Sequence, residues 1–167
     1  VMMWDDHDIF DGWGSHPDDR RTCPVFQGVY GVARRSFALF QVGCAPDDPP
    51  DCVWGGELGT FTQGFRIGDL GIFAPDLRTE RTQGRVMSEA TWEALPGWLD
   101  RFDGCRHLLL MSSVPMVFAN LHALEKLINF LPAQASMEDD LRDQWRSYVH
   151  EEEYIRLVRL LGTAARE

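Results

Sequence analysis

The residues best suited to chemistry lie within the first seventeen positions. An apolar run, Val1 to Trp4, leads directly into an acid-rich stretch that contains Asp5, Asp6, His7, Asp8 and Asp11. Carboxylates held this close repel one another, and a neighbouring cation is the usual way to keep all of them ionised. Because Met3 and Trp4 should be buried, the acids that follow cannot all reach bulk water. The pattern predicts a strand that ends at a divalent or trivalent metal site, with a solvated turn as the alternative.

The spacing of these residues resembles a known family signature. The run Trp4-Asp5-Asp6-His7-Asp8, followed by Gly12-Trp13, is similar to the W-D-D-H-[DE] motif of the alkaline phosphatase D-like (PhoD-like) branch of the metallophosphoesterases. Three later segments fall in the order that this branch shows, namely D-L-R-T-E-R at 76–81, M-S-S-V-P at 111–115 and D-L-R-D-Q-W at 140–145. The resemblance therefore covers nearly the whole chain.

The resemblance implies a hydrolase of phosphate monoesters or diesters that uses a two-metal centre. Carried over by position, Asp6 is a metal ligand with Asp5 as the alternative, His7 is the general acid, and Asp8 orients the ring of His7. The ions would be calcium, manganese, iron or zinc, and the partner would be a small phosphate ester. The rival hypothesis is a non-catalytic or structural module in which one cation orders the acidic loop.

An arginine cluster follows the apolar segment 70–74, which is predicted to be a strand. Arg78 and Arg81 lie just past the strand end, where guanidinium groups can grip phosphate oxygens bidentately. The alternative is a salt-bridge network with Asp76 and Glu80, because the segment supplies its own acids. Both interpretations predict that this loop is charged and ordered.

Other motifs of the family do not accompany this one. The resemblance places D-x-H and G-D-x-x-D motifs upstream of Trp4, where this chain has three residues, and a G-D-x-H motif downstream, which the chain lacks. We therefore expect residues 1–167 to be a single segment of a PhoD-like domain that is incomplete at both ends. The remainder of the parent chain would then be a partner, and the isolated chain would be inactive or weak.

Composition narrows the class of protein. The chain has 167 residues, 44% of them hydrophobic, and a net charge of −10, which together fit one globular domain. Nucleic acids and anionic membranes are excluded as general partners by this charge, and no apolar run reaches membrane-spanning length. Cys44 and Cys52 flank an acidic loop and would pair only in an oxidising compartment. A reducing, cytoplasmic setting is slightly favoured, and export of the parent stays open.

The elements that must position the site follow from periodicity. The sequence predicts a helix from Pro24 to Gly43, a hairpin of 60–67 and 70–74, and a helix capped by Ser88 that Pro96 should kink or split. The apolar face of the first helix should be Val25, Val29, Ala33, Phe37 and Phe40.

The second half of the chain is predicted to be one strand followed by helices. Residues 107–111 should form a central buried strand that ends at Ser112-Ser113, and the last third should form helices near 124–131, 141–148 and 154–161, with Glu152 and Arg156 as a surface pair. Asp143 matches the family pattern and would support the site indirectly, with an ordinary surface acid as the alternative. The expected fold is α/β, a partial metallophosphoesterase-like sandwich with few strands, flanking helices and a mostly helical C-terminal part.

Overall fold

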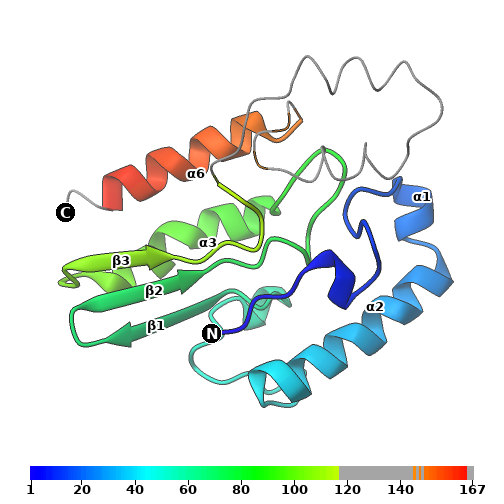
Figure 1. Ribbon diagram of the computed structural model, residues 1–167, viewed down its shortest axis with the longest axis horizontal. Helices are drawn as coiled ribbons and strands as arrows, with labels where there is room; N and C mark the ends of the chain where they lie inside the picture. Colours follow the sequence, from blue (N-terminus) through cyan, green and yellow to red (C-terminus); the bar gives the residue numbers. More distant parts are fainter. Residues whose placement is uncertain (117–144, 146, 148, 165–167) are drawn as a thin grey trace.

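A computed structural model describes residues 1–116, 145, 147 and 149–164 and has a mixed α/β architecture, as the sequence predicts (Figure 1). Along the chain its elements are η1 (Asp6–Asp8), α1 (Asp18–Arg21), α2 (Pro24–Phe37), η2 (Ala38–Val42), η3 (Gly56–Leu58), β1 (Gln63–Ile67), β2 (Leu70–Ala74), α3 (Glu89–Leu99), η4 (Asp100–Phe102), β3 (His107–Leu110) and α6 (Glu151–Ala164). The predicted helix near 124–131 and Asp143 lie outside the described residues, and of the predicted helix near 141–148 only residues 145 and 147 are described.

Among the described residues, the sheet has three strands in the order β1-β2-β3. Strands β1 and β2 pair antiparallel, with Ile67 opposite Leu70, so Gly68 and Asp69 form the two-residue turn of the predicted hairpin. Gly68 has φ +58°, a left-handed conformation that glycine adopts without strain. β3 joins β2 in parallel after a crossover through α3. The hairpin prediction is thus confirmed.

Two strand predictions need correction. β3 forms, but among the described residues it lies at the sheet edge and exposes alternate residues, with Leu109 outward and Leu108 and Leu110 against the core. Residues 1–5 are not a strand of this sheet. The carbonyl of Met2 accepts a hydrogen bond from the side chain of Gln63, and no ladder joins this segment to β1.

Helix α2 begins at Pro24, passes into the π-type turn η2 and ends where Gly43 adopts φ +79°. The side of the helix that faces the core is formed by Phe26, Tyr30, Ala33 and Phe37. Ala33 and Phe37 belong to the predicted face, whereas Phe26 and Tyr30 replace the predicted Val25 and Val29. Val25 and Phe40 are 71% and 78% exposed, so their assignment to the core is wrong. The exposed apolar residues form an outer face, comprising Val25, Val29, Val32, Leu39 and Phe40.

Helix α3 has the predicted cap and turns one face to the core. Ser88 Oγ accepts a hydrogen bond from the Thr91 N–H at 3.2 Å, and Trp92, Leu95 and Leu99 are buried. Pro96 lies inside the helix without ending it. α6 packs Tyr154 and Leu157 on the same core, and Arg156 pairs with Glu89 at 2.8 Å in place of the expected Glu152.

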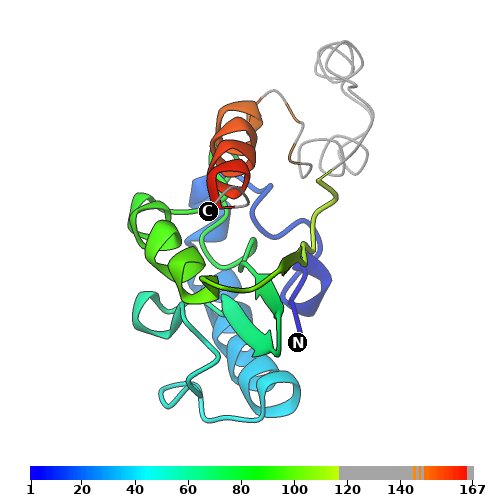
Figure 2. The ribbon, with the colours of Figure 1, turned by 90° about the vertical axis from the view of Figure 1, so that its left-hand side faces the viewer.

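Two hydrophobic clusters result, one around β2, α3 and α6 and the other under α2. Figure 2 shows the strands lying between α3 and the N-terminal segment. The second cluster contains Trp4 and Trp13, so the acid-rich stretch begins at one buried tryptophan and includes another. Within the described residues, no helix has the length and apolarity needed to span a bilayer.

Candidate functional site

The acid-rich loop, residues 5–16, folds back on itself around the short turn η1. The Asp8 carboxylate accepts a hydrogen bond from the Asp5 N–H at 2.9 Å, and the Asp6 carboxylate accepts one from the Gly12 N–H at 2.9 Å. Ring Nε2 of His16 lies 2.9 Å from the Asp11 carbonyl oxygen and ties down the far end of the loop. Acid side chains that satisfy nearby backbone N–H groups hold a turn in one conformation.

Trp4 anchors the start of this loop. Its indole is 2% exposed and lies among the rings of Tyr30, Phe37 and Phe61, with centroid distances of 5.1 to 5.8 Å. The indole N–H donates to Asp76 Oδ1 at 3.2 Å. Because Asp5 and Asp6 follow directly in the chain, the burial of Trp4 fixes where their backbone emerges.

Asp76 is the polar centre of the second segment. Beyond the Trp4 indole, its carboxylate accepts hydrogen bonds from the N–H groups of Phe61, Arg78 and Thr79 at 2.7 to 2.9 Å, and from the Thr79 hydroxyl. A hydrogen bond to a charged group typically contributes about 1.5–3 kcal/mol. The loop after β2 is therefore locked at its first turn.

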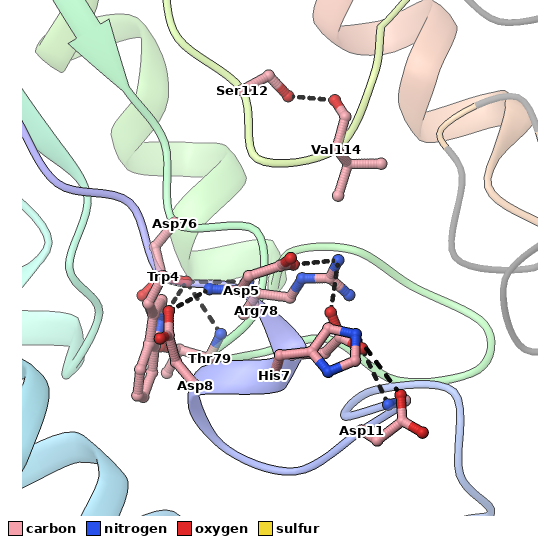
Figure 3. Close-up of polar contacts among 12 residues, drawn as sticks. Trp4, Asp5, His7, Asp8, Asp11, Asp76, Arg78, Thr79, Ser112 and Val114 are labelled. Atoms are coloured by element: carbon pink, nitrogen blue, oxygen red, sulfur yellow. Dashed lines mark hydrogen bonds and ion pairs between the residues drawn. The ribbon is translucent and has the colours of Figure 1, made fainter.

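Arg78 brings the two segments together. Its Nη2 lies 2.6 Å from Asp5 Oδ1 and 3.4 Å from Asp6 Oδ1, and its side chain is 3% exposed (Figure 3). Asp5 and Asp6 both belong to the acid-rich loop. Glu80 accepts a hydrogen bond from the Ser88 N–H. The sequence placed Arg78 and the motif acids in one site, and the structure puts them in contact.

The pKa values of Asp5 and Asp6 are shifted in opposite directions. Burial raises the pKa of Asp5 above its ordinary value, and the adjacent carboxyl of Asp6 adds to that rise. Burial also opposes ionisation of Asp6, but Arg78, the Asp5 carboxyl and the Gly12 N–H together hold its pKa below the ordinary value. Asp6 is therefore the more persistent anion, which favours it over Asp5 as a ligand.

One group of possible metal ligands is found in the part of the chain that the structure describes. Single ligand atoms of Asp6, His7 and Asp11 lie within 4.8 Å of one another. His7 Nε2 is 3.7 Å from Asp11 Oδ1, and both side chains are exposed. Asp8, predicted to orient the His7 ring, instead bonds the Asp5 N–H, and the carboxylate beside the ring is that of Asp11.

These donors fit a hard or borderline cation, since carboxylate oxygens and an imidazole nitrogen suit calcium, manganese, iron or zinc. Three side chains are enough to begin one coordination shell. A second ion held about 3.5 to 4 Å from the first would need donors beyond this group. The described donors could thus hold one ion, and the two-metal centre stays a prediction.

Arg81 takes a different position from Arg78. It is fully buried, its guanidinium lies 3.4 Å from His150 Nδ1, and its stem packs where a side chain on Gly14 would otherwise project. Arg81 therefore braces the acid-rich loop from behind. Its predicted phosphate contact stays a prediction, and it would require the covering residues to move.

At the end of β3, the Ser112 hydroxyl donates to the carbonyl of Val114 and so stabilises the turn that follows the strand. Sequence reasoning named Asp76 only in a salt-bridge network and gave Thr79 no role, and it grouped Asp11 with the motif acids without placing it beside the His7 ring. A signal existed for each: Asp76 precedes Thr79 by three residues directly after a strand, an Asx-turn spacing, and Asp11 follows His7 by four.

Comparison with known proteins identifies the family. The model of a family described as PhoD related phosphatase matches residues 1–137. The chain belongs to this family. A relative, an uncharacterized protein of Saccharomyces cerevisiae, is 27% identical over 197 residues, and the match covers 92% of this chain and 28% of the relative. The chain thus spans little more than a quarter of that relative. No solved structure matches the chain.

Proposed function

We propose that the protein hydrolyses phosphate monoesters or diesters with the help of bound metal ions, and that the acid-rich loop supplies part of the metal site. The observation that carries this proposal is the convergence of Asp5, Asp6 and Arg78 at the mouth of the loop, beside His7. The family to which the chain belongs supports phosphatase chemistry.

In this proposal Asp6 is a ligand of the metal, and Asp5 is held beside it by Arg78. The metal, when bound, supplies positive charge that polarises the phosphate ester and activates the attacking water. Arg78 can shift one of its donors from a carboxylate to a phosphoryl oxygen and so orient the substrate, because its planar fork fits both anions.

In this proposal His7 protonates the leaving group. Its ring is exposed to solvent and therefore to a substrate, and its Nε2 lies 3.7 Å from Asp11 Oδ1. His7 is also a possible metal ligand in this geometry. The two roles predict different responses to the leaving group.

The rival proposal is a module that binds one cation without catalysis. It is favoured by the size of the described ligand group, which suffices for one ion and not two. Metal analysis combined with phosphatase assays separates the two functions.

The test is to titrate the full-length protein and residues 1–167 with manganese and calcium and to assay both with mono- and diester substrates. We expect metal-dependent turnover on the order of 1 s⁻¹ or more by the full-length protein. Residues 1–167 alone should bind metal weakly and turn over slowly or not at all. Metal binding without hydrolysis by the full-length protein would favour the non-catalytic module, and two tight ions with ordinary turnover in residues 1–167 would refute the expected need for further ligands.

A further inference from the structure

We infer that Asp76 is a positioning residue of the proposed site, holding Arg78 against Asp5 and Asp6 without touching substrate or metal. The role in catalysis rests on the proposed function. The geometry that assigns it does not, because every contact involved is a hydrogen bond or ion pair within the described residues.

The two carboxylate oxygens of Asp76 join different parts of the site. Oδ1 accepts from the Trp4 indole and from the N–H groups of Arg78 and Thr79, whereas Oδ2 accepts from the Phe61 N–H and the Thr79 hydroxyl. One oxygen therefore connects the residue before Asp5 to the residue that carries the guanidinium. This bridge sets the register between two segments that lie 72 residues apart.

Burial makes the bridge rigid. Asp76 is 6% exposed and its five donors come from four residues, so its carboxylate cannot rotate without leaving several of them unsatisfied. Arg78 then needs only its own side-chain torsions to reach Asp5, because its backbone is already fixed. Precise support of this kind determines whether a side chain in a site is productively placed.

The chain contains a matched control. Glu153 also accepts one indole N–H, from Trp92 at 2.9 Å, and two backbone N–H groups, from Val86 and Met87 at 2.8 and 3.1 Å. These contacts fasten α6 to α3 and to the preceding loop, and none involves the acid-rich loop. Glu153→Gln therefore removes a structural carboxylate of the same kind from a different place.

The test is a double-mutant cycle on kcat/KM for phosphate-ester hydrolysis by the full-length protein. Asp76→Asn should lower kcat/KM by roughly 10-fold in the wild-type background and by less than about 2-fold in an Arg78→Ala background, because coupled residues are not additive. Glu153→Gln should leave kcat/KM within about 2-fold of wild type. Equal losses from Asp76→Asn in both backgrounds would overturn the inference.

Two further measurements keep the test decisive. If Asp76→Asn does not fold, Thr79→Val removes one donor to Asp76 at nearly constant volume and enters the same cycle. If the wild-type protein hydrolyses nothing, the proposed function fails, and the cycle of Asp76→Asn with Arg78→Ala is read from urea unfolding instead. There the combined change in the unfolding constant should be at least about 3-fold smaller than the product of the single changes. Additive changes would refute the positioning role independently of catalysis.

Discussion

At the residue scale, the site places opposite charges side by side in a partly buried setting. Arg78 pairs with two carboxylates, and without its positive charge the ionisation of both would cost more free energy. His7 lies beside Asp11, and both side chains are exposed to solvent. Each charged group thus has a nearby partner that a metal ion or a phosphoryl group could replace.

The role of His7 can be tested by the leaving group. His7→Ala in the full-length protein should lower the hydrolysis of an alkyl phosphate, a poor leaving group, about 10²- to 10⁴-fold, and that of p-nitrophenyl phosphate far less. A general acid matters only when the departing oxygen is basic. Steady-state kinetics with both substrates measure this difference, and equal losses would assign His7 to metal binding or folding.

The ligand role of Asp6 can be tested by metal content. Asp6→Asn should reduce both bound metal and turnover, because an amide oxygen is a weaker ligand than a carboxylate for a hard cation. Elemental analysis after dialysis, with Asp8→Asn as the control on the same turn, measures the loss. Full metal occupancy in Asp6→Asn would remove this residue from the coordination shell.

The contact between Arg78 and the motif acids could be anticipated only in part from sequence. The residue types and their positions after Trp4 and after a strand placed both segments at a charged site. Which acid Arg78 would meet depends on how the two segments pack. The hydrogen bonds that Asp76 accepts from the Trp4 indole and the Phe61 N–H join residues far apart in the sequence and leave no periodic pattern.

At the element scale, the acid-rich loop is held by packing from behind as well as by its own hydrogen bonds. Gly14 has φ +96°, and a Cβ added there would lie 2.7 to 2.8 Å from three carbons of the Arg81 side chain. The loop can therefore pass this close to Arg81 only with glycine at position 14.

Gly14→Ala should destabilise the protein more than Gly43→Ala. Both glycines have positive φ, which costs an alanine about 1–2 kcal/mol, but nothing lies within 4 Å of the position a Cβ would take at Gly43. Only Gly14→Ala must also displace Arg81. Urea unfolding of the two variants measures the difference, and equal losses would mean that the Arg81 stem yields freely.

Local sequence signals predicted where helices and turns begin and end better than they predicted which face of an element is buried. Ser88, the Gly68-Asp69 turn and Pro24 marked real boundaries because caps and turns are local chemistry. The core face of α2 was misjudged because Val25 and Tyr30 are both compatible with burial, and the aromatic cluster of Trp4, Trp13 and Phe61 selects the side with Tyr30. β3 was judged central from its leucines, although β2 is its only described neighbour.

At the scale of the whole molecule, Tyr30 links α2 to the site and makes stability sensitive to alkaline pH. Burial raises the pKa of Tyr30 above its ordinary value near 10, and the negative charge of Asp76 adds to the rise. Above about pH 10 the folded protein keeps a proton that the unfolded chain releases, so stability is fully present below that pH and falls as pH rises.

Tyr30→Phe should therefore flatten the fall in unfolding free energy above about pH 10. Urea unfolding at several pH values measures the slope in both proteins. The thiol of Cys44, whose pKa burial also raises, contributes a loss at lower pH that both proteins share. An unchanged slope above about pH 10 would show that Tyr30 does not resist ionisation in the folded state.

The exposed apolar face of α2 favours self-association of the molecule, and the net negative charge opposes it. A net charge of −10 makes copies of the chain repel one another over roughly 30 Å at 0.01 M salt, but over only about 3 Å at 1 M. Val25, Val32 and Phe40 are 71%, 56% and 78% exposed. The chain should consequently stay monomeric in buffers of low ionic strength and self-associate as the salt concentration is raised, which is the reverse of salting-in. Ionic strength should therefore determine how concentrated a solution of the protein can be made.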